Sequence, residues 1–484
     1  MSSPLPLEIF PIVFEHADDD DLFNIAAVSR TFNNLAFQTY FLRHEETPRP
    51  SLQVIDLQSS LLPSSYLQAL VSCLEFRGRN VDGLIYRYDP HRDWRVALCQ
   101  VKLLTRLLNT LGQIKRLELT LLLPFSRTRG LGRANAELLK AVNEKQCVHL
   151  DVSGRFTIYY RSLFAKSERK HHPDFGEFLP LLWAKQCLRI QSQNDEGSPS
   201  SKLNHMVVRY FPLTFRQYYF DALRGSKDTL TALDFINIPS YATKDFSILL
   251  SDVTFPNLQT FCLTSCKRVH QAAIVSFLAR HPGLTFLRYL LVDYSSNSKI
   301  VAPIPEILSS SFKKVMRLET SPQYILRLLP PLSQFPVLNK ITIYTSVGSD
   351  IKLAKDLDTA LASLQACRSD VDLTILSPCY ENGLEQWVTR SLDIEDNTRP
   401  ETHLHCVRSL TLEHQRAGFR DTMLELLPAW CALFPNLHKI HLKGFTKKPH
   451  YAIPLQAQRL ARVRKELSRL CPSVHTFTVE PGYY

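Results

Sequence analysis

Residues 255–284 read FPNLQTFCLTSCKRVHQAAIVSFLARHPGL, and their pattern sets the architecture expected of the chain. Leu258, Phe261 and Leu263 follow an L-x-x-L-x-L spacing. The last two alternate as in a strand with one buried face. The stretch QAAIVSFLARH, residues 271–281, then has the apolar spacing of a helix. One strand and one helix in fewer than thirty residues are typical of one repeat in an α/β solenoid.

Related segments recur along the chain. With a leading proline they are FPVLNKITI at 335–343, FPNLHKIHL at 434–442, CPSVHTFTV at 471–479 and a looser copy, HPGLTFLRYL, at 281–290. Without it they are IKRLEL at 114–119, LTALDF at 230–235, VMRLET at 315–320 and VRSLTL at 407–412. The pattern is poor between residues 60 and 230. We therefore predict a curved α/β solenoid with a parallel sheet, irregular in its first half.

A different pattern occupies the first 44 residues. Ile9, Ile12 and Val13 are spaced as on a helix, and an acidic run at residues 18–21 can cap the start of a second helix. Ser29 is placed to cap a third. Three helices of this length bury little core alone, so the segment is expected to pack on a neighbour or to bind a partner.

The run LPLEIF, then IVF, DL and VSRTFNNLA closely resembles the F-box motif across residues 4–44. Residues 258–284, with Cys266 at an inward position, resemble the cysteine-containing leucine-rich repeat often found behind F-boxes. The resemblance implies an F-box protein with a C-terminal leucine-rich-repeat-like domain. The expected domains are an F-box at 1–46, an irregular repeat-like or linker α/β region at 47–229, and a repeat-like domain with a C-terminal cap at 230–484.

F-box proteins bind the Skp-type adaptor of cullin-RING ubiquitin ligases. The resemblance implies a substrate-recognition subunit of an SCF-type (Skp–cullin–F-box) E3 ligase, which is not itself an enzyme. It also implies that the apolar adaptor contacts include Leu5, Pro6, Ile9, Val13, Leu22, Val28 and Phe32. Some of these side chains belong instead to the internal core, and the sequence does not separate the two roles.

The two variable positions of each L-x-x-L-x-L segment point away from the core, and on a curved sheet they line the concave face. The candidate substrate-binding residues are Arg116, Asp234, Thr260, Arg317, Lys340, Thr342, Lys439 and His441. Because basic residues recur among them, an acidic or phosphorylated protein segment is the expected ligand. The other interpretation is an ordinary solvated strand face without a specific ligand.

Charge is distributed unevenly over the 484 residues. The chain has 57 basic and 46 acidic side chains, a net charge of +11, but residues 1–50 hold eight acidic and three basic ones. This asymmetry suggests two modules with different partners. The basic body, with RYFPLTFRQYYF at 209–220, leaves open a non-catalytic scaffold or a nucleic-acid-binding protein that acts without ubiquitylation. We interpret that stretch as core and insertion, and therefore do not favour nucleic acid as a partner.

Motifs for chemistry are weak. Gly130 and Gly132 lack the third glycine of a nucleotide-binding fingerprint, so RGLGRAN at 129–135 is interpreted as an insertion loop. His403 and His405 lack a third ligand at useful spacing. We therefore expect no catalytic residue, cofactor or metal.

The eleven cysteines contain no C-x-x-C, and no apolar run approaches the length that spans a bilayer. Reduced thiols, an intracellular location in cytoplasm or nucleus, and no membrane partner are expected. Residues 455–480 are predicted to form the last helix and strand of the array, because one side of the helix is apolar and the other basic.

Overall fold

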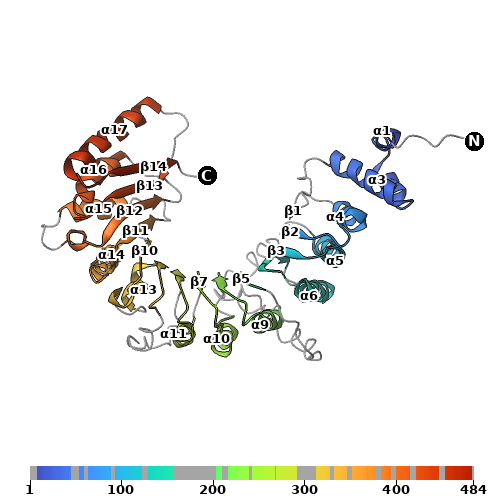
Figure 1. The fold of residues 1–484 in the computed structure, drawn as a ribbon, viewed down its shortest axis with the longest axis horizontal. Helices are drawn as coiled ribbons and strands as arrows, with labels where there is room; N and C mark the ends of the chain where they lie inside the picture. Colours follow the sequence, from blue (N-terminus) through green and yellow to red (C-terminus); the bar gives the residue numbers. More distant parts are fainter. Residues whose placement is uncertain are drawn as a thin grey trace, which may run out of the picture. The chain divides into compact units, whose positions relative to one another are not determined.

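The computed structural model describes residues 8–44, 54–58, 64–88, 93–122, 129–145, 147–155, 203–209, 216–238, 242–266, 269–290, 312–327, 332–345, 351–367, 369–377, 383–393, 399–414, 421–445 and 453–481. The chain divides into two compact units, Met1–Asn257 (unit 1) and Leu258–Tyr484 (unit 2). Strands and helices alternate along the chain, and in each unit the helices lie on one side of the strands (Figure 1).

Unit 1 opens with three helices, α1 (Ile9–Phe14), α2 (Asp19–Ala26) and α3 (Arg30–Arg43), as the sequence predicts. The Asp18 carboxylate accepts a hydrogen bond from the Asp21 amide at 2.7 Å and thereby caps α2. The Ser29 hydroxyl accepts one from the Phe32 amide at 3.2 Å and caps α3.

The repeats of unit 1 follow directly. Their elements are β1 (Val54–Gln58), α4 (Ser64–Ser72), η1 (Leu74–Phe76), β2 (Val81–Arg87), α5 (Trp94–Thr110), β3 (Ile114–Leu122), α6 (Arg129–Glu144), β4 (His149–Arg155), β5 (His205–Arg209), α9 (Arg216–Gly225), β6 (Ala232–Ile236) and α10 (Thr243–Asp252). Strands β1 to β6 pair in parallel in their sequence order. This is the strand order of a solenoid, in which each repeat contacts its neighbours.

Unit 2 continues the same alternation. Its elements are β7 (Thr260–Thr264), α11 (Gln271–Ala279), β8 (Phe286–Leu290), β9 (Arg317–Thr320), α13 (Pro322–Arg327), η4 (Leu332–Gln334), β10 (Lys340–Tyr344), α14 (Ile351–Leu364), β11 (Val371–Ser377), α15 (Gly383–Asp393), η6 (Pro400–His403), β12 (Val407–His414), α16 (Asp421–Cys431), β13 (Lys439–Phe445), α17 (Ile453–Leu470) and β14 (Thr476–Pro481). Strands β7 to β14 again pair in parallel in sequence order. The predicted α/β class with a parallel sheet is confirmed.

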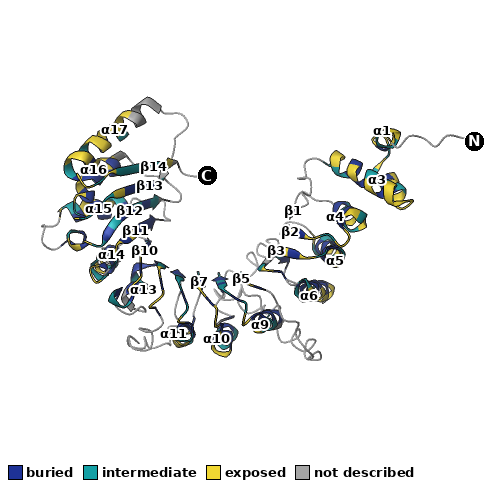
Figure 2. Ribbon diagram, in the orientation of Figure 1, coloured by how far each residue is buried: buried dark blue, intermediate teal, exposed yellow. Residues whose placement is uncertain are grey.

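The core lies between the strands and the helices of each unit. Leu258, Phe261 and Leu263, the three apolar positions of the best repeat, are fully or almost fully buried. Figure 2 shows the same arrangement along both units, with buried residues where the strands face the helices. The L-x-x-L-x-L spacing therefore marks the side chains that join each strand to its helix.

One sequence prediction is wrong. Residues 129–135 do not form an insertion loop, because they begin helix α6. Leu131, Ala134 and Leu138 of this helix are buried, and a Cβ at Gly130 would come within 3.7 Å of Leu98 on α5. Packing of the apolar face against the neighbouring helix outweighs the weak helix propensity of the two glycines.

The last predicted repeat is present as a helix and a strand. Helix α17 buries Val463 and Leu467 and leaves Arg459, Arg462, Lys465 and Arg469 exposed, and β14 pairs with β13. Across the described parts of the chain, no helix combines the length and the apolar character needed to cross a bilayer.

Candidate functional site

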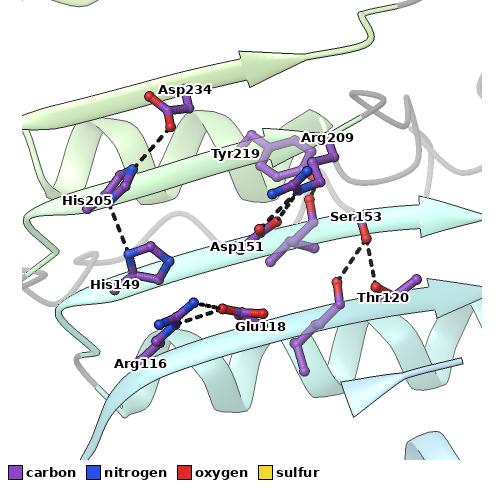
Figure 3. Close-up of polar contacts among 12 residues, drawn as sticks. Arg116, Glu118, Thr120, His149, Asp151, Ser153, His205, Arg209, Tyr219 and Asp234 are labelled. Atoms are coloured by element: carbon purple, nitrogen blue, oxygen red, sulfur yellow. Dashed lines mark hydrogen bonds and ion pairs between the residues drawn. The ribbon is translucent and has the colours of Figure 1, made fainter. Parts of the chain in front are cut away.

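Strand register brings polar side chains of unit 1 together on the sheet face opposite the helices. Arg116 on β3 pairs in register with His149 on β4, which pairs with His205 on β5. Two residues further along each strand, Glu118 pairs with Asp151. Residues two apart on a strand share a face, so these positions form adjoining rows. We call Arg116, Glu118, Thr120, His149, Asp151, Ser153, His205, Arg209 and Asp234 the β3–β6 polar cluster (Figure 3).

Ion pairs order this cluster. The Arg209 Nε atom lies 3.0 and 3.1 Å from the two carboxylate oxygens of Asp151 on the neighbouring strand. The Arg116 Nε atom lies 2.7 Å from Glu118 Oε1 on its own strand. Burial raises the pKa of Asp151, although Arg209 acts in the opposite direction. The cationic groups therefore have carboxylate partners before any ligand arrives.

The two histidines form a polar chain across three strands. Their Nδ1 atoms are 3.0 Å apart, so one ring donates a hydrogen bond to the other. His205 Nε2 then lies 3.4 Å from Asp234 Oδ2. Burial lowers the pKa of His149 to about 4, and repulsion from His205 and Arg116 acts in the same direction. His149 is therefore neutral at pH 7 and presents a hydrogen-bonding group instead of a charge.

Unit 2 carries a more basic group on the corresponding face of β8–β10. We call Phe286, Arg288, Arg317, Glu319 and Lys340 the β8–β10 arginine patch. Glu319 is only 2% exposed and accepts a hydrogen bond from Arg288 Nε at 2.5 Å and another from Arg317. Both guanidinium groups also lie over the Phe286 ring, 5.6 and 4.6 Å from its centroid.

The arginine patch has an excess of positive charge. Lys340 is exposed and pairs in register with Arg317 on β9 and with Asp372 on β11, so three cations face two carboxylates. The buried Glu319 fixes both arginines in position, while the side chains of Arg288 and Arg317 remain 33% and 44% exposed. Such fixed guanidinium groups are suited to carboxylate or phosphate oxygens.

The remaining predicted contact residues are distributed over both units. Arg116 and Asp234 belong to the polar cluster of unit 1, whereas Arg317 and Lys340 belong to the arginine patch of unit 2. Thr342 is buried and Thr260 half-buried, so neither presents much surface. Lys439 is exposed on β13, and His441 hydrogen-bonds to Thr478 on β14.

Sequence reasoning missed His149, Asp151, His205, Arg209 and Arg288. Four of them lie on β4 and β5, which the repeat motif did not identify. A usable signal was present, because Cys147, Leu150 and Val152 have the L-x-x-L-x-L spacing if cysteine and valine are accepted at leucine positions. All three are buried.

The helices α1–α3 carry a second kind of surface, which is apolar. Ile9, Ile12 and Val13 of α1 and Val28, between α2 and α3, are 38%, 59%, 53% and 71% exposed, and we call them the N-terminal apolar patch. Of the other predicted adaptor contacts, Leu22 has no exposed surface and belongs to the core. Phe32 is half-buried, with its ring 4.8 Å from that of Phe10. Leu5 and Pro6 lie outside the described residues.

The aromatic stretch that left nucleic-acid binding open lies partly in α9. There Tyr218, Tyr219 and Phe220 are buried, and the Tyr219 hydroxyl donates to the Val152 carbonyl at 3.3 Å. These rings form core as the sequence interpretation favoured, so they offer no stacking surface to bases. Among the described residues, no group of three or more His, Cys, Asp or Glu side chains is arranged to hold a metal ion.

Neither the models of known protein families nor the curated proteins match this chain. The function of its surfaces therefore has to be argued from their residues.

Proposed function

We propose that this chain is the substrate-recognition subunit of an SCF-type ubiquitin ligase. The N-terminal apolar patch binds a Skp-type adaptor, and the face opposite the helices holds a protein substrate. The single observation that carries the proposal is the N-terminal apolar patch itself, on a segment whose sequence resembles the F-box motif. Ile9, Ile12 and Val13 are three and four residues apart on α1 and share one face, and exposed apolar side chains that share a face are typical of interaction sites.

The connection between α3 and the first repeat supports this role. The Asn33 amide donates hydrogen bonds to the carbonyl oxygens of Ala26 and Ser72, both at 3.1 Å, and its side-chain oxygen accepts one from the Leu74 amide at 2.8 Å. Asn33 is 6% exposed. One buried side chain thus joins α2, α3 and the first repeat, and an adaptor held by the helices is held in a fixed orientation to that repeat.

The mechanism of such a subunit is proximity. It supplies no reacting group of its own, because ubiquitin arrives from a separate enzyme of the complex. Holding adaptor and substrate on one chain raises the effective concentration of substrate lysines near that enzyme. The β8–β10 arginine patch is the face best suited to an acidic or phosphorylated substrate segment, because Glu319 holds two guanidinium groups in place and its three cations outnumber the carboxylates of Glu319 and Asp372.

Co-purification with a Skp-type adaptor tests the adaptor surface. We expect Val13→Asp combined with Val28→Asp to weaken adaptor binding at least about tenfold, because each carboxylate must be desolvated at the contact. Leu42→Asp is the matched control. Leu42 is also an exposed apolar residue, 47% exposed, but lies about 18 Å along α3 from its start.

Both variants should keep the wild-type melting temperature, because all three positions are exposed. Equal adaptor binding by both variants would remove the N-terminal apolar patch as the adaptor site. Leu22→Asp is unsuitable as a test, because Leu22 is buried and its replacement would unfold the helices.

The same double variant allows the substrate surface to be tested. Asn33 joins α3 to the repeats, so deletion of helices α1–α3 would expose the first repeat. The variant with Val13→Asp and Val28→Asp keeps these helices in place on the repeat. Proteins captured by this variant in cells are compared with those captured after adding Lys340→Glu or, as a control, Lys355→Glu, because Lys355 is an exposed lysine of α14 on the opposite side of the strands. Loss of captured proteins with Lys340→Glu but not with the control supports the arginine patch as the substrate surface. Capture of the same proteins by all three variants refutes it.

A further inference from the structure

Two cysteines of unit 2 lie close together although 38 residues separate them in the sequence. Cys367 follows α14, and Cys406 directly precedes β12. The Cys367 amide donates to the Leu364 carbonyl at 2.9 Å, and the Cys406 thiol donates to that same oxygen at 3.3 Å. The two thiols also hydrogen-bond to each other.

The backbone around the pair is fixed. The Val371 amide donates to the Cys406 carbonyl at 2.7 Å, at the point where β11 and β12 begin to pair. Arg408, two residues beyond Cys406, makes an ion pair with Asp370 at 3.0 Å. The proximity of the thiols therefore follows from the strand pairing of neighbouring repeats.

Exposure distinguishes this pair from most other described cysteines. Cys367 and Cys406 are partly exposed, whereas Cys73, Cys147, Cys262, Cys266, Cys431 and Cys471 are buried. The buried residues serve as small core side chains, as the sequence analysis expects. A small oxidant in solution has access to the pair at 367 and 406.

The two thiols differ in their electrostatic surroundings. The hydrogen bond from Cys367 lowers the pKa of Cys406, and Arg408 acts in the same direction, against burial and the Asp370 carboxylate. The same hydrogen bond and burial raise the pKa of Cys367. Because the thiolate is the nucleophile, Cys406 is the first of the two to react.

We propose that Cys367 and Cys406 form a dithiol that peroxide oxidises reversibly to an intramolecular disulfide. The Cys406 thiolate attacks one oxygen of hydrogen peroxide and the O–O bond breaks, giving a sulfenic acid and hydroxide. The Cys367 sulfur then attacks the Cys406 sulfur, so that the S–S bond forms and the S–O bond breaks. Two thiols and one peroxide thus yield one disulfide and two waters, and a dithiol reductant reverses the change.

The disulfide would join the end of α14 to the start of β12, across the repeat that contains β11. Closing this loop restricts the unfolded chain, so the oxidised protein should melt at a higher temperature. This site is independent of the proposed ligase role, because it uses neither the N-terminal apolar patch nor the β8–β10 arginine patch.

Peptide mapping of the full-length protein tests the proposal. Protein treated with one equivalent of hydrogen peroxide is alkylated, digested with trypsin and measured by mass spectrometry. We expect the peptides 356–368 and 391–408 to appear cross-linked and to separate after reduction. Cys431 and Cys471 provide the matched control, because the Cys471 thiol lies 3.6 Å from the Pro428 carbonyl and both cysteines are buried. They should remain uncross-linked.

Two variants test the order of reaction. In Cys367→Ser the Cys406 sulfenic acid has no resolving thiol, so a dimedone probe should label Cys406 strongly. In Cys406→Ser, labelling of Cys367 should be at least about tenfold weaker. Absence of the cross-link while exposed Cys99 is oxidised would overturn the proposal, and so would cross-linking of the buried pair at the same rate.

Discussion

At the residue scale, one buried and one half-buried acidic side chain lie beside tryptophans on the helix side of unit 2. Glu401 of η6 has no exposed surface and accepts a hydrogen bond from Trp430 Nε1 at 3.3 Å. Trp387 packs against Trp430, with ring centroids 5.4 Å apart, and donates to Asp358 at 2.7 Å. Burial raises the pKa of Glu401 and of Asp358. At a pH between the unfolded and the folded pKa, these carboxyl groups therefore keep protons in the folded state that they release in the unfolded chain.

Replacing Glu401 tests this linkage. A raised pKa in the folded state means that stability is lost as pH rises from the unfolded pKa through the folded one. Glu401→Gln keeps an acceptor for Trp430 and removes the charge, so it should melt no lower than wild type at pH 7.5. The advantage should shrink as the pH falls toward 5.

Glu401→Ala is the control. It leaves the Trp430 N–H buried without its acceptor and should cost about 1–3 kcal/mol at both pH values. Thermal melts across the pH range provide the measurement. Parallel pH profiles for wild type and Glu401→Gln would contradict a titrating Glu401.

His149 gives a second prediction at this scale. Its pKa of about 4 has three causes, which are burial, His205 and Arg116. Its folded pKa is depressed, so stability is lost as pH falls from the unfolded value toward about 4. In His205→Gln the repulsion disappears, and NMR of labelled imidazoles should show the pKa of His149 rising. Exposed His16→Gln is the control, and an unchanged titration in His205→Gln would exclude coupling between the rings.

At the element scale, the junction between α3 and the first repeat depends on Asn33. Asn33→Ala leaves the Leu74 amide without its acceptor and two carbonyl groups without a donor. We expect a loss of about 2 kcal/mol in unfolding free energy. Asn34→Ala is the control, because Asn34 is exposed on the same helix and should change stability by no more than about 0.5 kcal/mol. Denaturant melts measure both, and equal effects would mean that the junction contributes nothing.

The same scale shows what the sequence could predict about the fold. The motif located β3, β6 to β10 and β12 to β14 because leucine, isoleucine or phenylalanine fills the central one of its three inward positions. Strand β5 follows the same spacing, but methionine, Met206, takes the central position between the buried Leu203 and Val208. A search for leucine-like residues passes over this strand, whereas the core requires only an apolar side chain of suitable volume.

The candidate site was harder to predict than the fold. A single strand shows which residues point away from the core, but not which residue of the next strand lies beside them. Arg288 was missed because it lies in the loose copy of the motif at 281–290, whose variable positions were not among the candidates. Its contact with Glu319 depends on the register between β8 and β9, across 26 residues of intervening sequence. Similarly, helices α1–α3 were predictable, but the burial of Leu22 and the exposure of Val28 depend on how they pack.

At the scale of the whole molecule, the array needs a protected end. Helix α17 and β14 cover β13, with Val463, Leu467 and Cys471 buried. A truncation after residue 454 should therefore expose the β13 edge, lower the melting temperature markedly and cause aggregation. Removal of only residues 482–484 is the control and should have no such effect. Light scattering and thermal melts are the measurements, and a soluble truncation with the wild-type melting temperature would show that the last repeat is dispensable.

The agreement between strand order and chain order has a mechanical consequence. Within unit 2, every strand from β7 to β14 pairs with the strands next to it in the sequence. Pulling on the C-terminus would therefore load one interface between repeats at a time. The repeats should detach one after another and not in a single cooperative step. Each step would require the free energy of one interface between repeats, so unit 2 would unfold gradually under tension. It could then refold onto the repeats that remained folded.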